Sequence, residues 1–96
     1  MPRMFISVED KEESKTYFLE WSTISDLPNS KVVEEKDFPD LYQRLGYYDS
    51  QFAGDLERLN ETGVSSPHYT KEDLLECSDD IETEEQLLEF CRTFLN

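Results

Sequence analysis

The chain has 96 residues, enough for one domain with a hydrophobic core, and we treat residues 1–96 as a single compact domain. Its 23 acidic and nine basic residues give a formal net charge of −14, and such a field repels nucleic acid and anionic membrane surfaces. The charge therefore argues against direct binding of nucleic acid or membrane and favours a basic protein surface or a cation.

The N-terminal part of the chain alternates apolar and polar side chains, which is the pattern of a β-strand with one buried face. The alternation runs through residues 4–9 and again through residues 16–23. We predict that these runs form an antiparallel hairpin with a somewhat long loop, and that residues 31–34 add a short third strand.

From Asp37 onward the apolar residues follow a helical spacing. One helix is predicted over residues 38–45, with Asp37 as its N-cap and Gly46 at its end. A second helix is predicted to begin near Asp49 or Ser50 and to end at Gly63.

The last third contains two capping boxes, in which a threonine is followed three residues later by a side chain that can bond back to it. Thr70 with Asp73 predicts a short helix, and Thr83 with Gln86 predicts a longer terminal helix. The expected core face of the terminal helix consists of Leu87, Cys91 and Phe94.

Together these elements predict an α+β fold, in which an N-terminal antiparallel β-hairpin or small sheet packs against three to four short helices. One face of the hairpin carries Ile6, Val8, Leu19 and Trp21. We expect this face to pack against the apolar side chains of the two middle helices, which are Leu41, Leu45, Phe52, Leu56 and Leu59.

The acidic residues are concentrated near the C-terminus, where nine carboxylates fall within the 18 residues from Glu72 to Glu89 with no base among them. A continuous helix there would carry one charge about every 3 Å, close to the phosphate spacing of one DNA strand, although a break around residues 78–82 is expected to bend the row. A solvated face that keeps the protein soluble is the alternative interpretation. The candidate partner-binding residues are Glu72, Asp73, Glu76, Asp79, Asp80, Glu82, Glu85 and Glu89.

Two polar corners form the second candidate site. The segment WSTISDLP ends the second predicted strand with several hydroxyls and an aspartate, and Ser65 and Ser66 follow the helix that ends at Gly63. These side chains can tie off backbone groups, with Asp26 as the expected acceptor, or they can converge on a flat ligand stacked on Trp21 or Tyr69. The candidate ligand-binding residues are Trp21, Ser22, Ser25, Asp26, Ser65 and Ser66.

Other chemistry finds little support in the sequence. A calcium loop starting at Asp10 lacks the glycine and the final glutamate that it needs, and His68, Cys77 and Cys91 are too widely spaced to indicate a zinc site. There is no glycine-rich phosphate loop. We therefore assign no catalytic residues and expect no enzyme activity, no cofactor and no metal. With two cysteines and no apolar signal segment in MPRMFISVED, the expected location is the cytoplasm.

Residues 17–28, YFLEWSTISDLP, and residues 56–66, LERLNETGVSS, carry a resemblance to a known group. They resemble small uncharacterised proteins encoded by bacteriophages and prophages, in which a strand ending W-S-x-I-S-D-x-P precedes a helix and an L-E-R-x-x-x-x-G-x-S-S segment. The resemblance covers the middle of the chain, and NSKVVEEKD after the proline replaces a turn typical of the group. It implies a phage origin, and small, strongly acidic phage proteins are often inhibitors of host nucleic-acid enzymes.

The leading hypothesis is therefore a non-catalytic inhibitor of anti-CRISPR-like type that binds a basic, nucleic-acid-handling host defence protein as a DNA mimic. One alternative is a small-ligand binding or sequestering protein that uses the Trp21 and Asp26 corner. Another is an immunity protein or antitoxin that neutralises a nuclease toxin. The sequence does not decide the oligomeric state.

Overall fold

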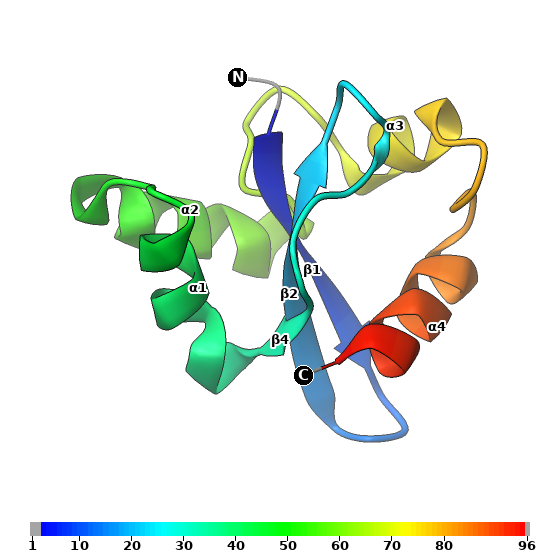
Figure 1. Ribbon diagram of the computed structural model, residues 1–96, viewed down its shortest axis with the longest axis horizontal. Coiled ribbons are helices and arrows are strands. Elements are labelled where there is room, and N and C mark those ends of the chain that lie inside the picture. The colour runs from blue at the N-terminus through cyan, green and yellow to red at the C-terminus, as the bar shows by residue number, and fades with distance from the viewer. Residues whose placement is uncertain (1–2, 96) are drawn as a thin grey trace.

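An antiparallel β-hairpin runs through the middle of the computed structural model, and helices lie on both sides of it (Figure 1). The structure describes residues 3–95. Strands β1 (Arg3–Asp10) and β2 (Lys15–Ser22) pair along their whole length, and β3 (Leu27–Pro28) and β4 (Val33–Glu34) both pair antiparallel with β2. The predicted α+β class and the hairpin are confirmed, and β4 lies within the predicted third strand.

The helices lie where their apolar spacing and capping signals predict them. After a short 3₁₀ turn (η1, Glu35–Asp37) come α1 (Phe38–Arg44), α2 (Asp49–Thr62), α3 (Lys71–Cys77) and α4 (Glu84–Phe94). Gly63 caps the C-terminal end of α2, and its φ of 82° lies in the left-handed region that glycine adopts without a steric penalty.

Three capping predictions can be compared with the structure. Both predicted boxes are present, because the hydroxyls of Thr70 and Thr83 each accept the backbone N–H of the third helical residue. In return the backbone N–H of each threonine donates to the side chain of that residue. The prediction that Asp37 caps α1 is wrong. Its φ of −98° and ψ of −3° already place it in a helical turn, and its side chain makes no capping hydrogen bond. A capping side chain reaches the free N–H groups from an extended residue, which Asp37 is not.

Both faces of the hairpin are buried, and this overturns the predicted packing. The face that carries Ile6 and Trp21 packs against α3 and α4, whereas the opposite face, with Phe5 and Phe18, packs against α1 and α2. The first cluster includes Met4, Ile6, Val8, Leu19, Trp21, Val64, Leu74, Leu75, Leu87 and Cys91. The second includes Phe5, Phe18, Val33, Phe38, Leu41, Tyr42 and Leu59. Because successive strand residues point to opposite faces, the apolar Phe5 and Phe18 require a second helical layer.

The outer edge of β1 is covered by the segment that follows α2. The Ser7 N–H donates to the Gly63 carbonyl and the Ser65 N–H donates to the Phe5 carbonyl, both at 2.9 Å. These bonds occupy backbone groups that an open strand edge would leave unpaired. They also fix the Ser65 corner against the start of the sheet.

The terminal helix is fastened to the hairpin by a buried ion pair. The Asp10 carboxylate is fully buried and accepts two hydrogen bonds from Arg92, each 2.8 Å long, and one from the Tyr17 hydroxyl at 3.0 Å. The hydrogen bonds from Arg92 hold the pKa of Asp10 well below its usual range. Phe94, predicted to be core, is 55% exposed instead and packs on Phe90. The next residue, Leu95, packs against the buried cluster instead, four positions after Cys91 and therefore on the same side of the helix.

Candidate functional sites

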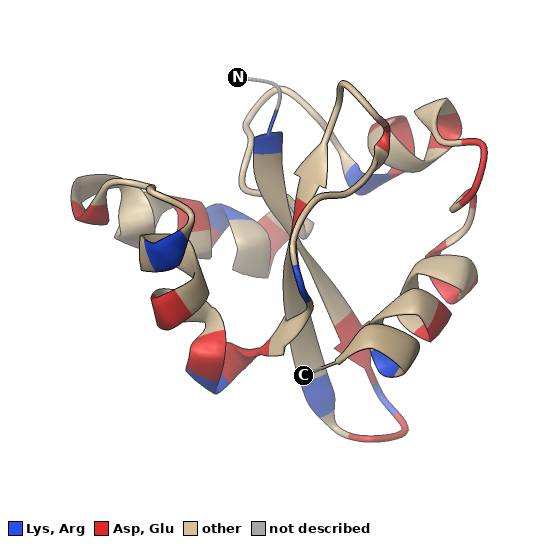
Figure 2. Cartoon of the chain, in the orientation of Figure 1, with Lys and Arg blue, Asp and Glu red and all other residues tan. Residues whose placement is uncertain are grey.

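All nine carboxylates of the acidic run are exposed, and we refer to them together as the acidic surface. They are Glu72, Asp73, Glu76, Asp79, Asp80, Glu82, Glu84, Glu85 and Glu89. Figure 2 shows them on α3, on the connection to α4 and along α4. The other 14 acidic residues and the nine basic residues together carry a formal charge of −5. The acidic surface therefore carries −9 of the total formal charge of −14.

The acidic surface is bent instead of forming one straight row. Helix α3 ends at Cys77 and α4 begins at Glu84, so the expected break between them is present. A groove of about 450 Å³ lies at this bend, lined by Glu72 and Glu76 of α3 and by Glu82, Glu84 and Glu85 near the start of α4. Glu82 lies just before the N-cap of α4, and its N–H donates to the Gln86 side chain at 2.7 Å. The bend gathers five carboxylates around one concave site.

The bases at the two ends of the acidic run do little to neutralise it. Within residues 3–95, the one salt bridge to the acidic surface joins Lys71 Nζ to Glu84 at 3.6 Å. Lys71 also donates to the Ser7 carbonyl, and Arg92 is engaged by Asp10 and Glu12. Neighbouring carboxylates within a Debye length of about 8 Å therefore repel one another across an exposed surface.

The Trp21 corner ties off backbone groups and offers no stacking platform. Trp21 is 0% exposed, so the prediction that it stacks on a ligand is wrong. Side chains of β2 alternate between the two faces of the hairpin, and Trp21 lies on the face that α3 and α4 cover. The Ser22 hydroxyl accepts the N–H groups of Ile24 and Ser25 at 3.2 and 3.4 Å. Ser22 therefore accepts the backbone bonds of this turn that the sequence analysis assigns to Asp26. Asp26 instead takes a left-handed conformation, with φ of 56°, which aspartate tolerates in turns.

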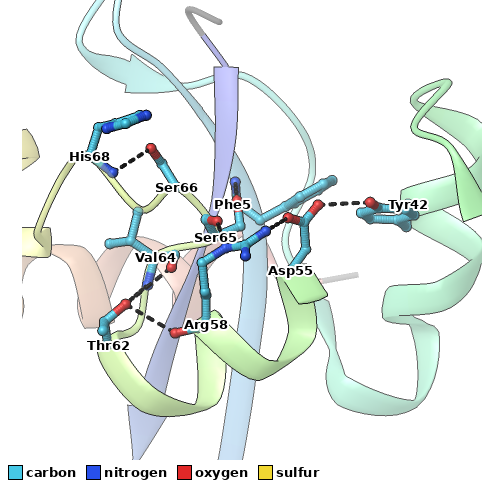
Figure 3. Close-up of polar contacts among 9 residues, drawn as sticks. All are labelled: Phe5, Tyr42, Asp55, Arg58, Thr62, Val64, Ser65, Ser66 and His68. Carbon is cyan, nitrogen blue, oxygen red and sulfur yellow. Dashed lines mark hydrogen bonds and ion pairs between the residues drawn. The ribbon is translucent and has the colours of Figure 1, made fainter. Parts of the chain in front are cut away.

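The second corner is held by a chain of polar contacts from α1 through α2 to the sheet (Figure 3). The Tyr42 hydroxyl donates to Asp55 at 2.7 Å, Arg58 donates to the other oxygen of Asp55 at 2.6 Å, and Arg58 Nε donates to the Ser65 carbonyl at 2.5 Å. The Ser65 hydroxyl oxygen accepts the Phe5 N–H at 2.9 Å. Ser65 is therefore a structural residue, and its neighbour Ser66 accepts the His68 N–H at 3.1 Å.

The two polar corners do not line one common pocket. Ser65 and Ser66 line a pocket of about 650 Å³, and residues 21–26 do not contribute to it. Its other walls come from Arg3 and from Tyr47 and Tyr48 in the loop between α1 and α2. Sequence reasoning missed these three residues. The signal that could have indicated the two tyrosines is their position as an aromatic pair directly after Gly46.

Among the described residues, no three His, Cys, Asp or Glu side chains are arranged to hold a metal ion. No helix between residues 3 and 95 is long and apolar enough to cross a membrane. Cys91 is buried, which raises the pKa of its thiol to about 12, while Cys77 is exposed.

Comparison with protein-family models, with curated proteins and with solved structures finds no match to this chain. The phage resemblance of the two middle segments therefore stays a prediction.

Proposed function

We propose that this protein is a non-catalytic acidic inhibitor of phage type, which binds a basic, nucleic-acid-handling protein in the host cytoplasm. The contact would be made by the acidic surface, whose carboxylates would take the place of DNA phosphates. The observation that carries the proposal is the exposure of all nine carboxylates, of which, in the described part of the chain, only Glu84 forms a salt bridge, with Lys71.

The electrostatic energy of the free protein supports this use of the surface. Like charges gathered on one small domain repel, and a basic partner would remove that repulsion on binding. The attraction acts over several ångströms, so it would also speed the encounter of the two proteins at low salt. A face that served only solubility has no need to concentrate −9 of the formal charge on two short helices and their connection.

The bend between α3 and α4 supports a protein partner in particular. The groove there presents carboxylates from both of its walls, including Glu76 on one side and Glu85 on the other. Such a groove suits a protruding Arg or Lys side chain, because charged hydrogen bonds can be made from more than one direction. We expect basic side chains of the partner to enter this groove and to pair with the flanking carboxylates.

Charge reversal tests the proposal with a matched control. The test variant changes Glu82, Glu85 and Glu89 to Lys, and the control changes the exposed Glu35, Glu57 and Glu61 to Lys. Both variants have a formal net charge of −8 in place of −14, so any difference between them comes from position alone. Each protein is immobilised and used to capture binding proteins from bacterial lysate, and the captured protein is then tested for DNA binding.

We expect wild type and the control to capture the same basic protein and to compete with DNA for it. The test variant should bind it about 3–6 kcal/mol more weakly, at about 1–2 kcal/mol per close charge pair. Association should also slow as salt rises, since the Debye length falls to about 3 Å at 1 M. Binding that survives both the reversal and high salt would contradict the proposal. The identity of the captured protein separates a defence nuclease from a nuclease toxin.

A further inference from the structure

The pocket of about 650 Å³ lies outside the acidic surface and differs from it in chemistry. Four segments far apart in the sequence supply its walls: the start of β1, the loop between α1 and α2, the first half of α2, and residues 65–69. Its volume lies within the range of about 300–1,000 Å³ that is usual for small-molecule sites. None of the nine carboxylates of the acidic surface lines it.

One wall of the pocket is held by a fully buried carboxylate. Glu20, in β2, is 0% exposed and accepts the Tyr47 hydroxyl at 2.6 Å and the Asn29 amide at 2.9 Å, and it lies 3.9 Å from the Arg3 guanidinium. Burial and the hydrogen bond to Glu20 raise the pKa of Tyr47, so its hydroxyl stays protonated and acts as the donor. A buried charge is costly, and here its bonds position two side chains that line the pocket.

A second wall of the pocket is held by another carboxylate of low exposure. The Asp55 side chain is 13% exposed and fixes Arg58, which in turn holds the Ser65 carbonyl (Figure 3). The segment that carries Ser66 and Tyr69 therefore starts from a fixed point beside α2. Both walls are set before any ligand arrives, which lowers the entropy that binding costs.

The side chains left free to meet a ligand are aromatic and cationic. Tyr48 is 74% exposed and Tyr69 is 41% exposed, although both rings line the pocket. The Arg3 side chain is 49% exposed, and its contact with Glu20 at 3.9 Å leaves donors available. Asp55 also lines the pocket, but it is already paired with Arg58. The pocket thus offers flat rings and one cation on a chain whose formal charge is −14.

We propose that this pocket binds a planar heteroaromatic ring that carries one phosphate group, the chemistry of a nucleoside monophosphate. The ring lies against Tyr48 and Tyr69, and the phosphate is met by Arg3. The strong negative field of the chain works against longer polyanions such as DNA, which limits the site to a small ligand. This inference is independent of the acidic surface and holds whether or not a protein partner binds there.

Four probes separate the ring from the anion: AMP, adenosine, ribose 5-phosphate and inorganic phosphate. Titration of the full chain is followed by calorimetry and by amide NMR, which also locates the site. We expect AMP to shift the amide signals of residues 45–48, Ser65, Ser66, His68 and Tyr69. Adenosine should bind more weakly, and the two probes without an aromatic base should bind most weakly.

Two variants test the assigned roles. Tyr48→Ala should weaken AMP and adenosine alike by about tenfold, as expected for the loss of one stacking ring. Arg3→Gln should weaken AMP by about tenfold and leave adenosine unchanged, since a charged hydrogen bond is lost. Phe94→Ala removes an exposed ring outside the pocket and should change neither affinity. Trp21 emission reports that each variant is folded.

Three results would overturn the proposal. The first is no amide shift with AMP, GMP, CMP or UMP at millimolar concentration. The second is AMP shifts that lie outside the pocket. The third is equal affinity for AMP and ribose 5-phosphate together with no effect of Tyr48→Ala, because this would leave only a site for an anion.

Discussion

The aromatic cluster between the hairpin and α1 should make a large contribution to stability, and Phe38 is the residue that tests it. Its side chain is 1% exposed, and its ring contacts four others. The centroid distances are 4.6 Å to Phe18, 5.0 Å to Phe5, 5.6 Å to Phe52 and 5.8 Å to Tyr42. Removing the ring leaves a cavity that these neighbours, themselves packed on one another, fill only in part.

Phe38→Ala should therefore lower the free energy of unfolding by about 3–5 kcal/mol, out of a total of about 5–15 for a domain of this kind. Phe38→Leu retains most of the volume and loses chiefly the ring contacts, so about 1–2 kcal/mol is expected. The leucine variant keeps the test usable if the alanine variant fails to fold. The loss expected for the alanine variant exceeds the usual error of a urea extrapolation, which is about 10–15% of the total.

Urea unfolding measures these losses, with Trp21 as the probe. It is the one tryptophan and is fully buried, and it lies on the face of β2 opposite the Phe38 cluster. A loss of 3 kcal/mol moves the midpoint by about 1–3 M urea. Phe94→Ala serves as the control because Phe94 is 55% exposed. If Phe38→Ala cost no more than the control, the second buried face of the hairpin would be refuted.

Three further predictions concern backbone, pH and thiols. Gly63→Ala and Gly46→Ala should each lower the free energy of unfolding in urea by about 1–2 kcal/mol, because both glycines have positive φ. The loss should be larger for Gly63→Ala, since its added Cβ would lie 2.9 Å from Lys71 side-chain atoms. Because the pKa of Asp10 is depressed, its ion pair with Arg92 stabilises the fold above about pH 4, and this stabilisation is lost as the pH falls toward the folded-state pKa. The stability of Asp10→Asn should therefore decrease less on acidification than that of wild type, as pH-jump unfolding would show. A maleimide should modify Cys77 quickly, and Cys91 only on unfolding, as mass spectrometry would show.

Each of these predictions has an outcome that contradicts it. Equal costs at the two glycines would mean that Lys71 moves aside freely. Parallel acid unfolding of wild type and Asp10→Asn would show that other carboxylates dominate the response to pH. Simultaneous modification of both thiols in the native protein would be incompatible with a buried Cys91.

Local pattern predicted the elements well but did not predict how they pack. The spacing of apolar residues and the two threonine boxes gave the strands and helices because those signals act within a few residues. The packing of the hairpin was wrong because Phe5 and Phe18 are as apolar as Ile6 and Leu19, and alternation does not say which helices cover which face. Only the tertiary structure assigns the two layers.

The two candidate sites also differ in how far the sequence predicts them. The acidic surface is contiguous in sequence, so its exposure could be predicted from charge alone. The pocket joins Arg3, Tyr48 and Ser66, which no local pattern connects. Its supporting residue Glu20 gave no signal either, because glutamate is ordinarily expected at the surface, whereas here bonds from distant side chains compensate its burial.

The positions of the two bases that flank the acidic run explain how the fold tolerates so much like charge. Lys71 donates to the Ser7 carbonyl on β1, and Arg92 is held by the buried Asp10 at the end of the same strand. These contacts fasten the start of α3 and the end of α4 to the hairpin, while Leu87 and Cys91 bury the inner side of α4. Because the anchoring groups differ from Glu82, Glu85 and Glu89, reversing those three charges leaves the attachment intact. Loss of partner binding in that variant would therefore report on the acidic surface and not on a loosened layer.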